Sequence, residues 1–388
     1  MPDSPQEHRF PCSRCGASLR FRPGQQEMVC DWCGHVQPIG PGDARAPGRQ
    51  PEAGPQDPAL QWDAAHKTPE LVEIPLERGL HLDATGSDIT HEVRTLSCPN
   101  CGARIDLDDT HHAGACPFCA TPVVTDTGAT RRIKPQGVLP FRLTEAEARK
   151  AMSDWLGGLW FAPSGLVAYA RKDRHLTGVY SPFWTFDADS TSRYSGQRGD
   201  VYYETHWVTE TVNGKSRRVA RRVPKVRWRP AQGRVARSFN DVLVPASTAL
   251  PQRFTGAMAP WDLSHLATYR PDFLAGFEAE GYTVALADGH GAARAQMARV
   301  IEGDVRRDIG GDQQRIHAVN SDFSAETFKH ILLPIWTAAY RYNGRSFRFV
   351  VNGQSGRVMG ERPWSVWKIA GATLLALVAL AIIMYFTR

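Results

Sequence analysis

A pattern of four cysteines occurs twice in this chain and constrains its fold more than any other feature. Each copy has the spacing C-x2-C, fourteen residues, C-x2-C, and the two copies use all eight cysteines of the protein. Two C-x2-C turns placed side by side supply a tetrahedral shell of four thiolates, the closed arrangement of a structural zinc site. The sequence therefore predicts two structural zinc ions. Their ligands are Cys12, Cys15, Cys30 and Cys33 in the first copy, and Cys98, Cys101, Cys116 and Cys119 in the second.

The residues around the cysteines favour metal binding over disulfides. Glycine follows the second cysteine of a pair at Gly16, Gly34 and Gly102, where a turn around sulfur needs a residue that adopts positive φ, and Ala120 departs from this rule. Four disulfides are the alternative, but they are typical of small secreted domains. No secretory signal peptide is recognisable, so we expect reduced cysteines in the cytoplasm.

Changes in composition divide the chain into five parts. The stretch from Gly40 to Pro58 is rich in Pro and Gly and has almost nothing to bury, which is typical of a flexible linker. The two ribbons are therefore expected to move relative to each other. The predicted parts are zinc ribbon 1 at 1–39, a flexible linker at 40–95, zinc ribbon 2 at 96–130, an α+β domain at 131–363 and a membrane anchor at 364–388.

Within the α+β domain, a helix pattern followed by a strand pattern occurs twice. Thr144 to Glu147 form a T-x-x-E capping box ahead of apolar residues at helical spacing. A second helix pattern comprises Ala293, Met297, Val300, Ile301 and Val305. We therefore predict an α+β fold with an internal duplication, in units at 131–200 and 280–363.

The strands of the two units share a motif and are followed by hairpin signals. Pro182-Phe-Trp184-Thr recurs as Pro334-Ile-Trp336-Thr, and Pro182 favours an edge strand or a bulge. Asn-Gly pairs at 213–214 and 343–344 predict tight hairpin turns.

The positive charge of the protein is concentrated around the first of these hairpins. The chain has a net charge of +6, and residues 211–240 contain ten Lys or Arg residues and no Asp or Glu. We consider a solvated hairpin, a surface for anionic lipid headgroups or an acidic partner, and a nucleic-acid surface. The candidate anion-binding residues are Lys215, Arg217, Arg218, Arg221, Arg222, Lys225, Arg227 and Arg229.

The C-terminus carries a candidate membrane span. Residues 369–386 contain no charge, and Trp364, Trp367, Lys368 and Tyr385 flank the run with aromatic and basic side chains. Eighteen residues of helix are about 27 Å long, close to the thickness of the hydrocarbon core of a bilayer. We expect a single-pass, tail-anchored protein in the cell membrane with its bulk in the cytoplasm.

Three blocks and the paired ribbons carry a resemblance to a bacterial family. The blocks are 178–187 (GVYSPFWTFD), 328–336 (FKHILLPIW) and 360–363 (GERP). The chain resembles proteins commonly labelled TFIIB-type zinc-ribbon proteins, or primosomal protein N′ (replication factor Y), superfamily II helicase. The resemblance also implies membrane-stress systems, in which a related zinc-ribbon membrane protein works with phage-shock-type and SPFH-type partners.

The search for catalytic motifs favours a protein that is not an enzyme. Gly214-Lys215-Ser216 resembles the end of a phosphate-binding loop, but residue 209 is Thr where that loop requires Gly. The Walker A loop and DExx box of a superfamily II helicase are both missing. We expect a membrane-anchored cytoplasmic scaffold that binds protein partners, with anionic lipid as a further ligand. The alternative is a nucleic-acid-binding protein of replication or transcription without a helicase motor.

Overall fold

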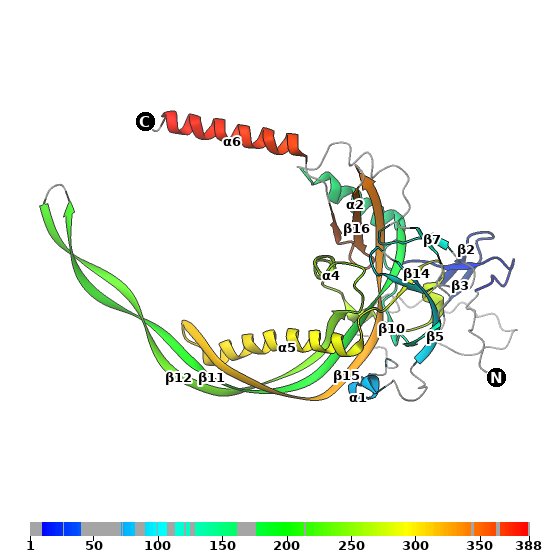
Figure 1. The fold of residues 1–388 in the computed structure, drawn as a ribbon, viewed down its shortest axis with the longest axis horizontal. Coiled ribbons are helices and arrows are strands. Elements are labelled where there is room, and N and C mark those ends of the chain that lie inside the picture. The colour runs from blue at the N-terminus through cyan, green and yellow to red at the C-terminus, as the bar shows by residue number, and fades with distance from the viewer. Residues whose placement is uncertain are drawn as a thin grey trace, which may run out of the picture.

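The computed structural model is built around two long antiparallel strands, β11 (Thr177–Val212) and β15 (Gln313–Tyr342), at the centre of a mixed sheet (Figure 1). Residues 178–188 of β11 and 328–337 of β15 are buried on both faces, which explains why both segments are largely apolar rather than alternating. The fold class is α+β, as predicted. The structure describes residues 10–25, 27–39, 71, 73–81, 90–98, 100–106, 113–119, 122–124, 129–160, 176–212, 215–342, 345–361 and 365–386.

Two units with the same order of elements form the centre of the sheet. Each has a short strand, a helix, a long strand and a returning strand. The first consists of β10 (Gly137–Val138), α2 (Glu145–Gly157), β11 and β12 (Lys215–Pro245), and the second of β14 (Glu278–Gly281), α5 (Leu286–Ile309), β15 and β16 (Arg345–Asn352). The first unit thus extends to residue 245 rather than 200, because β11 and β12 form a much longer hairpin than the sequence suggested.

Each unit completes the other. Strand β10 pairs in parallel with β15, and β14 pairs in parallel with β11. The indole N–H of Trp184 donates to the carbonyl of Val284, just before α5, at 3.1 Å. The indole N–H of Trp336 donates to the carbonyl of Leu143, just before α2, at 3.0 Å. The repeated Pro-x-Trp motif therefore ties the strand of one unit to the helix of the other.

The two motif prolines lie in the interior of the sheet, so the prediction of an edge strand or bulge at Pro182 is wrong. On β11, the short strand β14 pairs before Pro182, and pairing with β12 starts after it, at Phe183. On β15, the short strand β10 pairs before Pro334, and pairing with β16 starts after it, at Ile335. Each proline carbonyl accepts a bond from the same side, from Ala246 at Pro182 and from Gly353 at Pro334. Proline has no backbone N–H, and each motif proline consequently lies at the boundary between two partner strands.

Helix α2 begins as the sequence predicts. The N–H of Glu147 donates to the Thr144 hydroxyl at 3.3 Å, and the N–H of Thr144 donates to the Glu147 carboxylate at 2.8 Å. The bonds that the Thr144 N–H and hydroxyl donate to the carboxylate lower the pKa of Glu147. Ala148, Met152 and Leu156 face the core from successive turns.

Ribbon 2 is part of the main sheet. Strand β6 (Arg104–Asp106) pairs with β14, and β5 (Thr90–Ser97) joins β6 to β9 (Ala129–Ile133). Its apolar side packs on Val350 and Ile335. The ribbon also contains β7 (Ala113–Ala115) and β8 (Pro122–Val124).

Ribbon 1 packs on the same body and does not stand apart. It consists of β1 (Leu19–Phe21), β2 (Glu27–Cys30) and β3 (Val36–Pro38). The N–H of Phe21 donates to the carbonyl of Ala275 at 2.9 Å, and the Phe21 ring lies 5.4 Å from that of Phe273. The expectation that the two ribbons move relative to each other is thus not met: both are docked on the α+β body.

The second half of the predicted linker is structured where it is described. Strand β4 (Ile74–Pro75) pairs with β15, and α1 (Leu76–Leu80) follows it, while β5 begins at Thr90. Ile74 and Leu76 are buried against Phe328. The few apolar residues of this segment therefore have a docking role that composition alone did not reveal. Residues 40–70 lie outside the described part of the chain.

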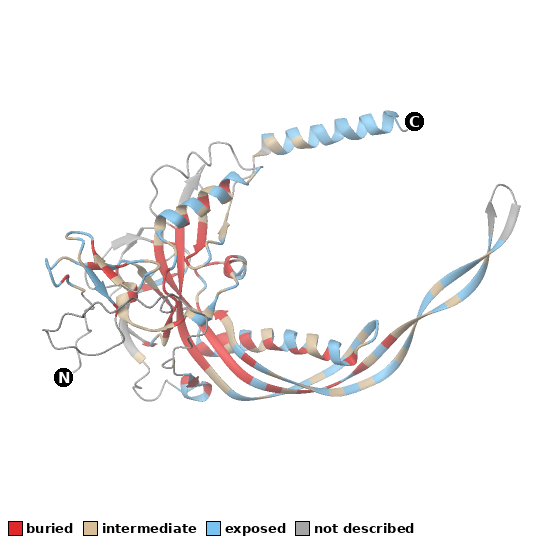
Figure 2. Ribbon diagram, turned by 180° about the vertical axis from the view of Figure 1, so that it is seen from behind, coloured by how far each residue is buried: buried red, intermediate tan, exposed pale blue. Residues whose placement is uncertain are grey.

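Short elements between and after the two units cover the ends of the sheet. They are α4 (Gln252–Met258), η2 (Leu263–His265), β13 (Ala267–Thr268), η3 (Pro271–Leu274) and β17 (Val358–Gly360). Strand β15 pairs with β11 as far as Gly199. Beyond this residue, β11 and β12 continue as a two-stranded hairpin that projects from the body. We call residues 200–227 the arm. Figure 2 shows that burial is concentrated in the body and fades along the arm.

A buried ion cluster holds the β4 segment on the sheet. The Lys329 ammonium, with only 7% of its side chain exposed, lies 3.2 Å from Glu73, 3.0 Å from Asp187 and 2.9 Å from Asp241. Burial opposes ionisation of Glu73, but Lys329 lowers the pKa of this carboxyl, and burial raises the pKa of Asp187. The Lys329 ammonium thus contacts carboxylates from three separate segments of the chain.

We expect Lys329→Met to reduce the free energy of unfolding by about 3 kcal/mol, because it leaves buried carboxylates without their counter-charge. The matched control is Lys150→Met, which removes an exposed lysine 3.3 Å from Asp154 and should cost about 0.5 kcal/mol or less. Chemical denaturation in detergent micelles measures both changes. Equal effects of the two substitutions would show that the cluster does not hold the body together.

Candidate metal centres and the arm surface

Each cysteine quartet is brought together by two turns of the same design. In ribbon 1 the N–H of Gly16 donates to the carbonyl of Cys12 at 2.8 Å, and that of Gly34 to Cys30 at 2.9 Å. Gly16 has φ of 74° and Gly34 of 69°. Positive φ turns the chain around the sulfur atoms, as the sequence predicted.

Ribbon 2 repeats this geometry. The N–H of Gly102 donates to the carbonyl of Cys98 at 2.9 Å, and Gly102 has φ of 74°. Ala120, the position without glycine, lies outside the described residues. The shared turn geometry shows that both copies present their sulfur atoms inward.

The sulfur positions fit a tetrahedral metal site. The Sγ atoms of Cys12 and Cys33 are 3.6 Å apart, and those of Cys15 and Cys30 are 3.5 Å apart. In ribbon 2 the distances are 3.5 Å for Cys98 to Cys119 and 3.6 Å for Cys101 to Cys116. Within each quartet all four Sγ atoms lie within 4.8 Å of one another. Four thiolates about 2.3 Å from one zinc ion would be separated by about 3.8 Å, so the two sets fit.

The chemistry of these sites is that of a closed metal centre. Four thiolates fill a tetrahedral shell and leave no coordination position for water or substrate. The metal would therefore hold the two turns of each ribbon together. Backbone N–H groups assist: the N–H of Cys33 lowers the pKa of the Cys30 thiol to about 7, which favours the thiolate that a metal binds.

The two centres differ in their exposure. In ribbon 2, Phe118 between the last two cysteines is fully buried, and Cys98, Cys116 and Cys119 are buried with it. The equivalent residue in ribbon 1 is Trp32, which is 86% exposed. Cys15 is also exposed. Cys12 and Cys30 are buried, so the ribbon 1 quartet is open to solvent on the side of Cys15 and Trp32, whereas the body covers that of ribbon 2.

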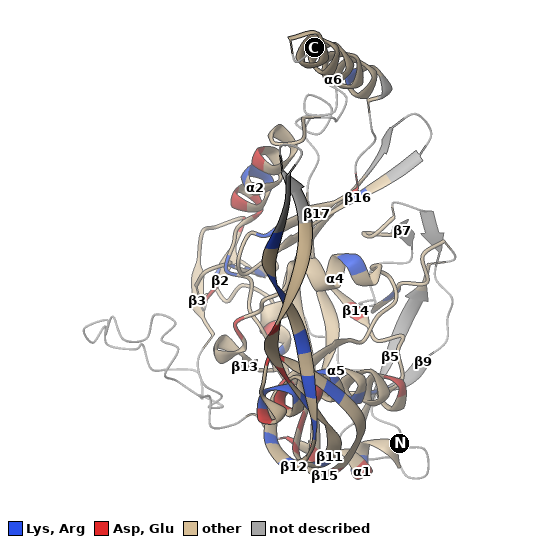
Figure 3. Cartoon of the chain, turned by 90° about the vertical axis from the view of Figure 1, so that its left-hand side faces the viewer, with Lys and Arg blue, Asp and Glu red and all other residues tan. Residues whose placement is uncertain are grey.

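The strand register divides the predicted basic residues between two faces of the arm. Because side chains alternate along each strand, Tyr202, Glu204 and His206 share one face with their partners Lys225, Val223 and Arg221. Arg227 and Arg229 extend this face towards the body, opposite Asp200 and Arg198. We call it the charged face. Figure 3 shows Lys and Arg spread along the hairpin.

On the charged face, carboxylates compensate the cations. Lys225 lies 2.5 Å from Glu204, and Arg229 contacts Asp200. The contact with Lys225 lowers the pKa of Glu204, and Arg198 together with Arg229 lowers that of Asp200. The sequence therefore correctly placed Lys225, Arg227 and Arg229 on one strand face. These cations already have partners, because Arg227 also lies close to a ring, 5.0 Å from that of Tyr202.

The other four predicted basic residues do not belong to the charged face as described. Arg218 and Arg222 are on the opposite face, paired with Thr209 and Thr205. The side chains of Lys215 and Arg217 are outside the described residues. The six of these residues whose side chains are described therefore do not form one surface, because alternation along the strands sends them to both sides of the hairpin.

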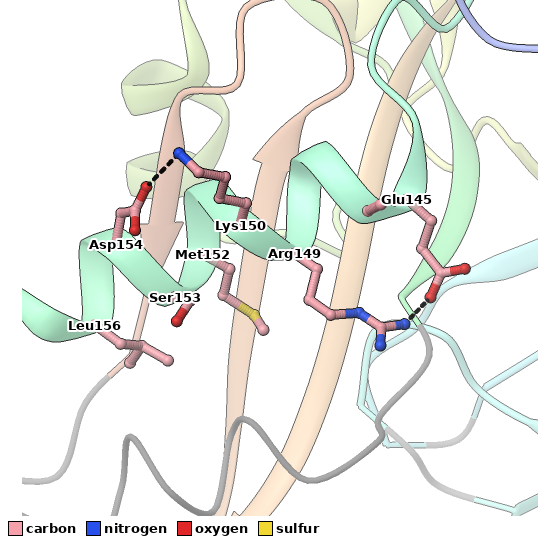
Figure 4. Close-up of a pocket in the computed structure, with 8 residues that line it drawn as sticks. Glu145, Arg149, Lys150, Met152, Ser153, Asp154 and Leu156 are labelled. Atoms are coloured by element: carbon pink, nitrogen blue, oxygen red, sulfur yellow. Dashed lines mark hydrogen bonds and ion pairs between the residues drawn. The ribbon is translucent and has the colours of Figure 1, made fainter.

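The described surface of the body has two depressions of a size that could hold a small molecule. One of about 500 Å³ follows α2, and its polar lining consists of the pairs Glu145–Arg149 and Lys150–Asp154 along that helix (Figure 4). The other, of about 670 Å³, lies between α5 and the start of β15. The charged residues that line the first depression form ion pairs four residues apart, and such pairs stabilise a helix. These side chains therefore have a structural explanation.

Comparison with known proteins gives one similarity. The uncharacterized protein YdjG of Bacillus subtilis (strain 168) is 26% identical over 268 residues, which cover 65% of this chain and 72% of YdjG. No family model and no solved structure matches the chain. Nothing in these comparisons supports the label primosomal protein N′.

The difference in exposure predicts two rates of zinc release. Zinc-loaded protein mixed with a chromogenic chelator should lose one ion quickly from ribbon 1 and the other slowly from ribbon 2. Cys12→Ser should abolish the fast phase, and Cys98→Ser the slow phase, and each variant should retain one zinc by metal analysis. A single phase in the unmodified protein would contradict the assignment.

Proposed function

We propose that this chain is a non-enzymatic scaffold that is anchored in the cell membrane by α6 (Val366–Phe386) and holds its body in the cytoplasm. The observation that carries the proposal is the exposure of this helix. Residues 367–386 are long and apolar enough to cross a bilayer, and none of this window is buried in the protein. Exposed Leu375, Ile383 and Phe386 would be costly in water, so a bilayer is the environment that fits them.

The two metal centres support a scaffold. Closed four-thiolate zinc sites stabilise small folds without taking part in reactions. Both ribbons are docked on the body, and the exposed Trp32 of ribbon 1 offers an apolar contact to a protein partner. Eight reduced thiolates suit a cytoplasmic location, which is the basis of the proposed orientation.

We further propose that this scaffold works in a membrane-stress system. It rests on the resemblance of the strand motifs and ribbons to a family of membrane zinc-ribbon proteins. A scaffold at the inner face of the bilayer would bring soluble partners to the membrane. Protein partners crosslinked in membranes, and lost from the Cys12→Ser variant, would support recruitment through ribbon 1.

Nucleic-acid binding is the second candidate, because the arm combines Arg residues with exposed aromatic rings. Such surfaces bind single strands by stacking and phosphate contacts. It predicts salt-sensitive binding that is lost when Arg218 and Arg222 are replaced.

Deletion of residues 365–388 should move the protein from the membrane fraction to the soluble fraction. The matched control replaces 367–386 by an unrelated apolar helix of equal length and should restore membrane retention, since only length and hydropathy are required. Fractionation followed by carbonate extraction provides the measurement. Retention of the deleted protein in membranes would show that another element anchors it.

A further inference from the structure

The arm has a second face whose composition differs from that of the charged face. Val201, Tyr203, Thr205, Trp207 and Thr209 of β11 share this side by alternation. Their partners on β12 are Val226, Pro224, Arg222, Ala220 and Arg218, and Trp228 opposite Gly199 continues the row. We call this the aromatic face.

The aromatic face exposes large rings. Tyr203 is 61% exposed and Trp207 is 64% exposed, although both lie in a regular strand pair. Trp228 is half-buried where the arm joins the body. Rings that combine an apolar body with a polar N–H or O–H favour the boundary between water and an apolar phase.

Arginine side chains accompany these rings. The Arg222 guanidinium lies 5.9 Å from the centre of the Tyr203 ring, and that of Arg315 lies 3.9 Å from the Trp228 ring. Arg218 lies on the same side, opposite Thr209 and diagonal to Trp207. Stacked guanidinium groups remain charged and keep N–H donors available for phosphate oxygens.

The acidic residues of the arm whose side chains the structure describes lie on the charged face. Asp200 and Glu204 occupy even positions of β11, whereas the aromatic face takes the odd positions. On the charged face, Glu204 pairs with Lys225, and Asp200 pairs with Arg229. The aromatic face therefore carries positive charge with aromatic side chains and has no carboxylate among the positions assigned to it by the register.

We propose that the aromatic face of the arm docks on the anionic headgroup layer of a phospholipid bilayer. The inference rests on the proposed membrane anchor, because α6 places the arm beside a bilayer. Cationic side chains complement anionic headgroups, and Trp and Tyr rings enter the interfacial layer.

The backbone of the arm limits how deep it can lie. Within the described residues of the arm, β11 and β12 pair only with each other, so each has an outer edge of N–H and C=O groups. Such edges cannot be buried in hydrocarbon, where no water satisfies them. The arm therefore lies in the interface, and it supplies a lipid contact that differs in kind from the span of α6.

The test compares two adjacent tyrosines on opposite faces. Full-length protein carries the photoreactive residue p-benzoylphenylalanine in place of Tyr203 or, as the matched control, of Tyr202. Each is reconstituted in vesicles of phosphatidylcholine alone or mixed with phosphatidylglycerol, and lipid adducts are quantified by mass spectrometry after irradiation. Position 203 should form several-fold more adducts than position 202, and only in vesicles with phosphatidylglycerol.

Charge variants with equal change in charge complete the test. Arg218→Gln with Arg222→Gln should reduce the adducts at position 203 to the level seen in phosphatidylcholine. Lys225→Gln with Arg227→Gln, on the charged face, should leave them unchanged. Equal adducts at 202 and 203, or adducts that do not depend on phosphatidylglycerol, overturn the proposal.

Vesicle flotation separates this proposal from that of the anchor. Protein that floats with vesicles but forms no adduct at 203 overturns the arm proposal alone. Protein that forms adducts at 203 but does not resist carbonate extraction supports the arm and overturns the anchor. Crosslinks from 203 to a second copy of the chain, or adducts displaced by single-stranded DNA, overturn lipid docking in favour of these occupants.

Discussion

The antiparallel pairing of β11 with β15 is the constraint on which the rest of the structure depends. Residues 178–188 of β11 and 328–337 of β15 are buried on both faces, so the elements on either side are required to cover them. Helices α2 and α5 are tied by hydrogen bonds from Trp336 and Trp184, each from the other unit. Since neither unit can bury its central strand alone, the two form a single body.

The zinc ribbons are part of this body. Ribbon 2 extends the sheet through β6, and its Phe118 lies in the same apolar cluster as Val350. Ribbon 1 docks through Phe21 on Phe273. A metal in each ribbon would therefore stabilise a surface of the α+β body as well as the ribbon itself, while Trp32 of ribbon 1 stays exposed.

The arm and α6 extend beyond the body (Figure 1). They differ in their backbone chemistry: a helix satisfies its own N–H and C=O groups, whereas a two-stranded hairpin has open edges. This difference suits α6 to the hydrocarbon core and the arm to a wet surface. Both features support the proposal that the protein holds its ribbons at a bilayer.

The sequence by itself determined the local features. The cysteine spacing, the capping box at Thr144, the repeated Pro-x-Trp motif and the apolar C-terminal run each depend on residues close together in the chain. Only the tertiary structure decided what depends on distant residues. Val300, part of the apolar pattern of the second helix together with Ile301, is 43% exposed, and segment 73–80 docks on the sheet instead of forming a linker. Whether a basic residue of the arm lies beside Glu204 or beside Trp207 depends on the register of two strands, which composition does not specify.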